Sequence, residues 1–334
     1  MSRFIARRAI HALFLVLITA AATFFVLQAA PGDAVDRYYS PEIDPAAMAR
    51  VRHQLGLDAP AHVQFAKWMA SAARGDFGMS LVQNRPVAEI LGETIPRTLE
   101  LTALSFLVQL LLGVSLGTFA GSRRGRGADR TVSVAMLVVY ALPAFYLAYL
   151  LITVFSLRLD WLPTSGMASI GPTPGWADRA AHRVLPVVVL GVASAAGLAR
   201  YTRGSIVDSL AEDHIRTARA KGVGEARVVW LHAFRNALPP LLTVVGLSVP
   251  FLLGGAVVVE KVFAWPGMGS LIVDSIFARD YPVVLAANLV SAGMVIAGNF
   301  LADVSYAFAD PRAARAAPSP RRKLSVRTDG GARG

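Results

Sequence analysis

The chain has 334 residues, of which 54% are apolar and only 16% are charged, against about 25% charged residues in a typical soluble protein. This number of charges is too small to cover an ordinary globular surface. We therefore expect lipid to cover part of the chain. Basic residues outnumber acidic ones, 33 to 22, but they flank long uncharged apolar runs, which argues against nucleic acid as a partner. The absence of cysteine excludes disulfides, thiolate metal sites and a cysteine nucleophile.

Six apolar segments are long enough to cross a bilayer as helices, because about 20 helical residues span a hydrocarbon core of roughly 30 Å. We therefore expect an all-α integral membrane protein with six transmembrane helices. The fourth and fifth segments contain several prolines and glycines, which favours either a place near the protein interior or a pathway, or close packing through small residues. The predicted spans are 10–30, 98–120, 131–157, 184–200, 237–259 and 282–308.

The first apolar run follows Arg3, Arg7 and Arg8, a pattern that a signal peptide also shows. Its uncharged stretch is longer than the roughly 7 to 15 residues of a signal-peptide core, which favours a retained span.

The distribution of basic residues predicts the orientation in the membrane. One side of the six spans carries 21 Lys and Arg residues and the other carries 12, and the richer side is expected to be cytoplasmic. This places both termini in the cytoplasm and a small helical segment outside, between the first two spans. The predicted cytoplasmic parts are 1–9, the loop after 120, 201–236 and a disordered tail at 309–334, and the external ones are 31–97, the loop after 157 and 260–281.

The cytoplasmic loop 201–236 predicts a helix, a turn and a second helix. The first helix ends before Gly222, which suits a left-handed C-terminal cap. In the second, Trp230, Phe234 and Leu238 form an apolar stripe at helical spacing. Such a stripe either docks into a groove on a partner or packs on the chain's own membrane helices.

Two stretches of this loop resemble a known signature. Residues 217–222 read Thr-Ala-Arg-Ala-Lys-Gly, and residues 231–240 read Leu-His-Ala-Phe-Arg-Asn-Ala-Leu-Pro-Pro. Both are similar to the signature loop of permeases in binding-protein-dependent ABC importers, in the form found in the B-type subunit of dipeptide, oligopeptide and nickel systems. Other motifs that resemble this subunit, in the same order and over about residues 1–312, are Pro31-Gly-Asp33, Gly56-Leu-Asp58, Gly75-Asp-Phe-Gly78, Arg85-Pro-Val87, Thr98-Leu-Glu100, Val262-Phe-Ala-Trp-Pro-Gly-Met-Gly269, Arg279-Asp-Tyr-Pro282 and Asp310-Pro-Arg312.

The resemblance implies a type I ABC importer permease fold and a bacterial plasma (inner) membrane complex. Its partners would be a second similar permease, cytoplasmic ATPase subunits that hold ATP and Mg²⁺, and an external solute-binding protein. The loop would couple ATP hydrolysis to transport by alternating access, although the broader signature's Glu-Ala-Ala triplet is replaced by Arg216, Thr217 and Ala218. The predicted coupling residues are Arg216, Thr217, Ala218, Arg219, Lys221, Gly222, Glu225, Trp230, His232, Phe234, Arg235 and Asn236.

This chain itself lacks a phosphate-binding loop around any of its lysines, so we expect no cofactor and no ATPase site in it. Its histidines show no metal-binding spacing, and no catalytic residues are expected. The favoured solute is a short peptide, with nickel chelates or another small solute as the alternative. An autonomous channel or ion-coupled carrier would leave the loop unexplained, and the missing metal-ligand and nucleophile patterns argue against a membrane-bound enzyme.

Two further groups of residues are candidates for the pathway. Phe263, Trp265, Pro266 and Gly267 lie in a predicted external re-entrant loop or gate, for which a turn with interfacial aromatic anchors is the alternative. Polar and amphipathic side chains within the spans either line a solute path or bond between helices. These are Gln28, Gln109, Tyr140, Tyr146, Asn288 and Asn299.

Overall fold

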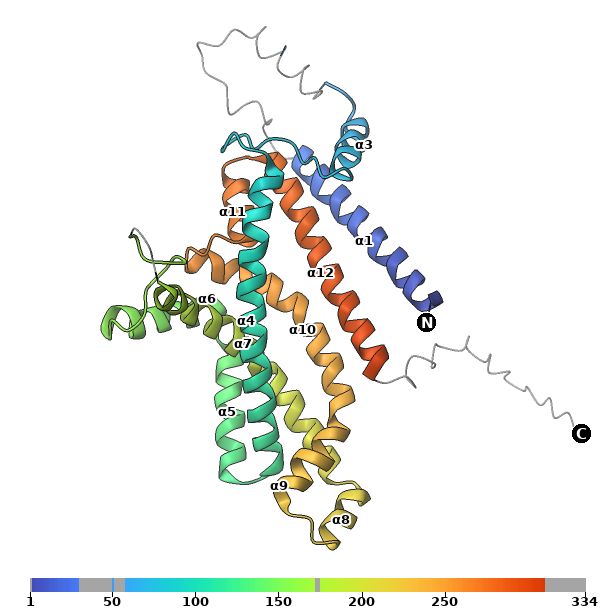
Figure 1. The fold of residues 1–334 in the computed structure, drawn as a ribbon, viewed down its shortest axis with the longest axis vertical. Coiled ribbons are helices and arrows are strands. Elements are labelled where there is room, and N and C mark those ends of the chain that lie inside the picture. The colour runs from blue at the N-terminus through green and yellow to red at the C-terminus, as the bar shows by residue number, and fades with distance from the viewer. Residues whose placement is uncertain (1, 30–49, 51–57, 172–174, 310–334) are drawn as a thin grey trace, which may run out of the picture.

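The structure is an all-helical membrane protein, as the sequence predicts. The computed structural model describes residues 2–29, 50, 58–171 and 175–309, and within these ranges it contains helices and one isolated β-bridge but no strand. Five helices are long and apolar enough to cross a membrane, and a sixth span results when one bent helix pair is counted as a single crossing (Figure 1).

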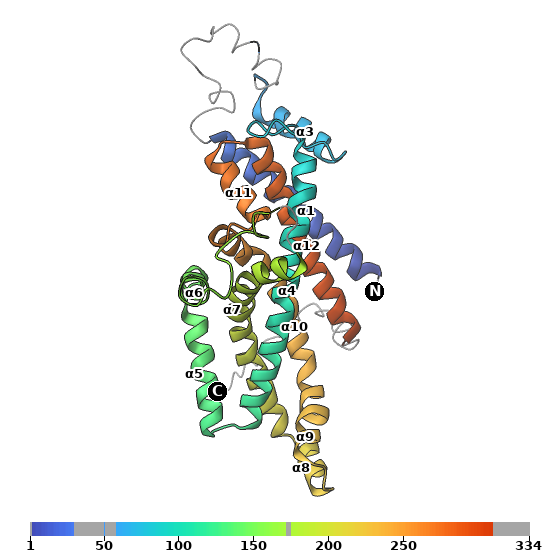
Figure 2. The same ribbon diagram turned by 60° about the vertical axis from the view of Figure 1, so that its left-hand side comes forward.

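Five long helices form the body of the bundle. Helices α4 and α7 pack against each other, and α12 contacts both α1 and α10 (Figures 1 and 2). In α7, 56% of the most apolar stretch is buried, against 11% in α1, so α7 lies in the interior and α1 at the periphery. The five helices are α1 (Ser2–Ala29), α4 (Val87–Ser122), α7 (Trp176–Leu210), α10 (Phe234–Val262) and α12 (Tyr281–Ala309).

Helices α4 and α7 extend far beyond the spans predicted at 98–120 and 184–200. Hydropathy marks only the part of a helix that suits lipid, whereas the polar turns at its ends keep helical hydrogen bonds. α4 begins directly after Pro86, and α7 continues through Pro186. The apolar runs therefore locate these spans but underestimate their helices.

Glycines allow α4 and α7 to approach each other closely. Gly113, Gly117 and Gly121 recur every four residues, which places them on one face of α4. The residue numbers of their α7 contacts increase in the same direction, so the two helices run parallel. Leu198 lies against Gly113, Thr202 against Gly117 and Ile206 against Gly121, while Gly191 of α7 lies against Val108 of α4.

The third predicted span, 131–157, is not one straight helix. Helix α5 (Gly127–Ala141) and helix α6 (Ala144–Leu151, continued as a π-helix over Ile152–Arg158) meet at an angle of 104°. Pro143 has no backbone N–H to donate, and its ring pushes Leu142 into an extended conformation with ψ of 128°. α6 consequently lies crosswise to α5 instead of continuing it (Figure 1).

The described part of the external segment is a short helix followed by a clamped turn. Helix α3 (Ala61–Ala72) packs on α1 through aromatic rings, with 5.4 Å between the Phe24 and Phe65 centroids. Beyond it, Asp280 accepts hydrogen bonds from the Ser80 hydroxyl at 2.5 Å and from the Leu81 N–H at 3.0 Å. These contacts join the segment to the start of α12. Residues 31–49, 51–57 and the tail 310–334 lie outside the described residues.

Candidate functional site

The predicted coupling loop lies at one end of the bundle, opposite the end that carries α3 (Figures 1 and 2). Helix α7 continues past the predicted end of its span at residue 200 as far as Leu210, and helix α8 (Asp213–Ala220) follows after a short break. A short α-helical turn, α9 (Glu225–Arg227), and a π-helix, η3 (Val228–Ala233), lead without interruption into α10. The loop is thus two helical arms joined by a turn.

The turn has the hydrogen bonds of a Schellman cap. Gly222 has a φ of +77°, its N–H donates to the Arg219 carbonyl at 2.9 Å, and the Val223 N–H donates to the Ala218 carbonyl at 3.2 Å. Only glycine adopts this left-handed conformation without steric cost. The turn agrees with the predicted role of Gly222 as a C-terminal cap.

A small apolar core holds the two arms together. It consists of Ile215 and Ala218 from α8 and Val228 and Ala233 from η3, all of them buried. Because the loop buries these side chains within itself, its shape does not depend on the membrane helices alone. This core also explains why Ala218, one of the predicted coupling residues, does not face outward.

The remaining polar side chains of the turn lie on its outer surface. Arg219 pairs with Glu225 across the turn, with 2.5 Å between Nη2 and Oε1, and this hydrogen bond raises the pKa of Arg219. Asn236 lies 2.8 Å from His214, which ties α10 to α8. The predicted coupling residues Arg216, Thr217, Arg219, Lys221, Gly222, Glu225, Arg235 and Asn236 are exposed, and His232 is half-buried.

The predicted apolar stripe is only partly covered by the chain. The rings of Trp230 and Phe234 lie 5.6 Å apart, and Trp230 is 52% exposed, as is its neighbour Leu231 at 53%. Val229, by contrast, is buried. The loop therefore presents an aromatic residue beside its charged turn instead of packing it on the membrane helices.

The residues predicted as an external gate lie at the other end of the bundle. Phe263 and Trp265 are buried, and the Trp265 indole N–H donates to the Arg97 carbonyl at 3.1 Å. Gly267 is buried directly before helix α11 (Met268–Phe277), whereas Pro266 is exposed. The segment is packed against α4 instead of standing free in solvent.

Sequence reasoning missed the buried carboxyl group beside this segment. Glu260 is fully buried, and it follows directly on the residue at which the fifth span is expected to end, Val259. A boundary drawn from hydropathy excludes it from the membrane helices, although α10 continues to Val262. The signal that could have found it is a lone acidic residue at the end of an apolar run of 23 residues, 237–259.

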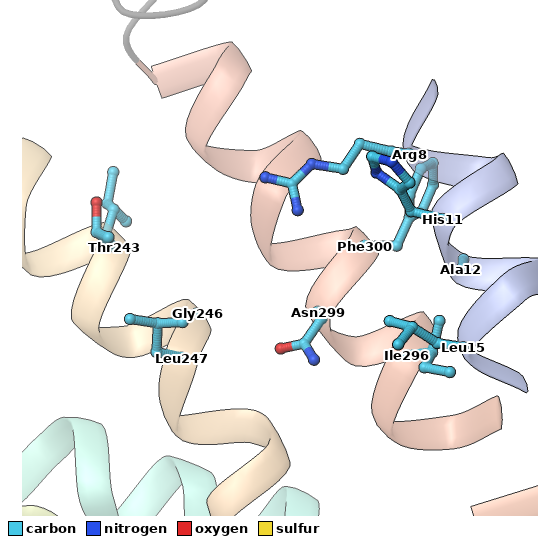
Figure 3. A pocket seen from close by; sticks show the side chains of 11 residues that line it. Arg8, His11, Ala12, Leu15, Thr243, Gly246, Leu247, Ile296, Asn299 and Phe300 are labelled. Carbon is cyan, nitrogen blue, oxygen red and sulfur yellow. The ribbon is translucent and has the colours of Figure 1, made fainter. Parts of the chain in front are cut away.

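The six predicted pathway residues do not form a single site. Asn299 lines a cavity of about 520 Å³ between α1, α10 and α12, together with Arg8, His11 and Thr243 (Figure 3). Tyr140 lines a separate cavity of about 330 Å³ between α4, α5 and α7. Of the others, Gln28 and Tyr146 are exposed, Asn288 is half-buried, and Gln109 is buried with no hydrogen-bond partner for its Oε1 among the described residues.

The chain resembles known proteins along nearly its whole length. The profile of the binding-protein-dependent transport system inner membrane component matches residues 113–315, and the profile of the N-terminal part of such membrane components matches residues 1–102. The chain is 40% identical over 313 residues to the oligopeptide transport system permease protein AppB of Bacillus subtilis, covering 93% of this chain and 99% of AppB. It is 42% identical over 311 residues to the glutathione transport system permease protein GsiC of Escherichia coli K12, covering 93% and 98%.

A solved structure of the MetNI methionine ABC transporter in inward-facing conformations shares the fold. It matches 66% of this chain and 96% of its own chain, with a TM-score of 0.55 and 19% identity.

Proposed function

This chain belongs to the family of inner-membrane components of binding-protein-dependent transport systems, and we propose on that premise that it forms half of an ATP-driven pathway for short peptides. It is a multi-pass membrane permease of the ABC importer type. The peptide assignment is supported by its relatives, since AppB is named for oligopeptides and GsiC for glutathione, itself a peptide.

The observation that carries the proposal is the loop between α7 and α10. Its buried core holds α8 against η3, while the Arg219–Glu225 pair, Lys221 and Trp230 remain on the outside. An exposed charged turn with an adjacent aromatic side chain suits insertion into a groove of a partner. That partner is an ATPase subunit in the cytoplasm, which binds ATP and Mg²⁺ and moves the loop as one body.

The proposed cycle is alternating access. ATP binding and hydrolysis in the ATPase subunits rock this permease against a second permease, and an external solute-binding protein delivers the peptide. No covalent chemistry takes place on this chain. The exposed apolar faces of α1 and α5 contact lipid or the second permease.

Transport by the whole complex tests this function. The chain is co-expressed and purified with candidate ATPase, second-permease and binding-protein subunits, and the complex is reconstituted in liposomes. We expect the binding protein loaded with short peptides to stimulate ATP hydrolysis and peptide uptake. Uptake without ATP or binding protein would establish a channel or ion-coupled carrier instead, and uptake of nickel chelates but not peptides would overturn the solute.

The role of the loop is tested at Gly222. A valine Cβ would meet no atom within 4 Å, so Gly222→Val acts only through the left-handed φ, at about 1 to 2 kcal/mol. We expect ATP hydrolysis to continue with much reduced uptake, and Gly222→Asn, which tolerates this φ, to retain most uptake. Equal uptake by both variants and the wild-type chain would contradict the coupling role.

The orientation is tested with single cysteines, because the chain has none of its own. Gln83 and Arg124 are both exposed, at opposite ends of α4. A membrane-impermeant maleimide added to intact cells should label Gln83→Cys, and it should label Arg124→Cys only after permeabilisation. The reverse pattern would place the termini outside the cytoplasm.

A further inference from the structure

A hydrogen-bond network joins α4 to the end of α10 and the start of α11. Both oxygens of the Glu260 carboxyl group, at the end of α10, accept hydrogen bonds. The Thr98 hydroxyl of α4 donates to Oε1 at 2.6 Å, and the Ser270 N–H of α11 donates to Oε2 at 3.0 Å. The Met268 N–H of α11 donates to the Thr98 hydroxyl at 2.8 Å. Each hydroxyl, carboxyl and N–H in this network has a partner.

The network is enclosed by the protein. Glu260 is 0% exposed and Thr98 4% exposed, and Glu260 forms no ion pair with any residue that the structure describes. A buried carboxyl group without an opposite charge depends on its hydrogen-bond donors, and the N-terminal turn of α11 supplies a favourable dipole as well. Loss of a single donor would leave an unsatisfied acceptor away from water.

The segment between α10 and α11 has no room to move independently. A Cβ atom on Gly267 would lie 2.5 Å from the Thr98 hydroxyl, and one on Gly269 would lie 2.6 Å from the Val257 Cα. Trp265 is fully buried beside them and bonds to the Arg97 carbonyl. Residues 265–268 therefore contact α4 at two successive residues, Arg97 and Thr98.

Glu260 also lies at the far end of the helix that begins in the coupling loop. η3 and α10 are continuous from Val228 to Val262, and 29 residues of α-helix span roughly 43 Å. Pro239, Pro240 and Pro250 interrupt the hydrogen bonds of α10 along the way, so this helix can bend. A movement of the coupling loop is therefore passed through α10 to α4 and α11 only if the external end of α10 is fixed to these two helices.

We propose that Glu260 and Thr98 are positioning residues that lock α4 to the external end of α10 and to the start of α11, so that the coupling loop moves the outer gate through α10. The proposal rests on the proposed transport function. In it, the segment 263–267 is not a freely moving plug but part of a body that opens and closes with α4. If the lock is broken, ATP hydrolysis proceeds, but the outer end of the pathway no longer moves with the coupling loop.

The test compares four variants in the reconstituted complex by the number of peptides imported per ATP hydrolysed. In Glu260→Gln the amide NH₂ must face one of the two donors, and in Thr98→Val the hydroxyl is lost. We expect either change to lower the ratio at least about tenfold, because each leaves at least one buried group of the network without a partner, and one such group corresponds to about that factor. Thr98→Ser keeps the hydroxyl and should stay within about twofold of wild type. The double variant should be no worse than either single one, because both break the same network.

Lys261 provides a matched control. Its ammonium group also joins α10 to α11, by an exposed ion pair of 2.6 Å with Asp274, but it does not contact α4 through that pair. Lys261→Ala should leave the ratio unchanged, since exposed ion pairs contribute little.

The outcomes separate the lock from a merely structural role and from the proposed function. A structural role would reduce the amount of assembled complex and its unfolding temperature but leave the ratio per complex at the wild-type value, and that result would overturn the lock. Equal defects in Thr98→Ser and Thr98→Val would also overturn it. If Glu260→Gln fails to assemble, Thr98→Val carries the test alone. Absence of ATP-driven uptake by the wild-type complex would instead refute the proposed function.

Discussion

Replacing Gly117 with alanine should force α4 and α7 apart. The new Cβ would lie 2.5 Å from the Ala199 carbonyl oxygen and 2.5 Å from the Thr202 Cβ. Neither neighbour can give way easily, because the first is helix backbone and Thr202 is fully buried with its hydroxyl bonded to the Leu198 carbonyl at 2.9 Å. Overpacking of this kind costs about 1 to 3 kcal/mol, and we expect the upper part of that range.

The same substitution at Gly92 is the matched control. Gly92 lies in the same helix, but nothing lies within 4 Å of its added Cβ. Alanine restricts the unfolded backbone more than glycine does, so Gly92→Ala should stabilise the chain by about 0.5 to 1 kcal/mol. The two substitutions, identical in chemistry, are thus expected to act in opposite directions.

Thermal unfolding of the purified chain in detergent measures both effects. The unfolding temperature should rank Gly92→Ala above wild type and wild type above Gly117→Ala. The reasoning would be refuted if Gly117→Ala were as stable as Gly92→Ala, because the close approach of α4 and α7 would then not depend on a missing side chain.

Two further substitutions test contacts between distant segments. Arg203→Ala should cost about 1.5 to 3 kcal/mol in thermal unfolding, because the buried Asp129 loses both hydrogen bonds from the half-exposed guanidinium and keeps only those from Gly125 and Ser133. Arg216→Ala, which breaks an exposed pair, should cost less than about 1 kcal/mol. Equal losses would contradict the assigned difference in burial. Asp280→Ala should destabilise the turn before α4 by about 1 to 3 kcal/mol, because the Ser80 hydroxyl and the Leu81 N–H lose their acceptor. Limited proteolysis should then cut the segment 74–86 faster while the helical body stays intact.

The helical fold and its family can be recognised from the sequence because both depend on local signals. Apolar runs locate the membrane helices, and the glycine at 222 by itself marks the turn that follows α8. The bend at Pro143 carries a local signal too, but an uncharged run of 27 residues, 131–157, suggests one straight span. The predicted class is correct, while the direction of the chain after residue 142 is not apparent from the apolar pattern.

The candidate site is predictable only where it is continuous in sequence. The coupling loop is one segment, so its residues can be named together. The lock combines Thr98 with residues more than 160 positions later, and the pathway candidates are separated across the bundle. Contacts of this kind depend on how helices pack, which the apolar pattern of each helix does not specify. Glu260 was missed for this reason as much as for its place beside the predicted boundary.

The glycine face of α4 has a consequence for how the protein is made. α4 is complete at Ser122, but its partner α7 ends only at Leu210, so the ribosome must add 88 more residues before the pair can close. At synthesis rates of about 5 to 20 residues per second, α4 waits in the bilayer for roughly 4 to 18 s. During that time the glycines offer no polar side chain to the lipid, whereas Ser105 and Gln109 continue the same face toward the start of α4 and have polar groups that α7 later buries. The part of α4 from Gly113 to Gly121 can thus remain in the membrane during biosynthesis without glycine side chains that would form incorrect polar contacts.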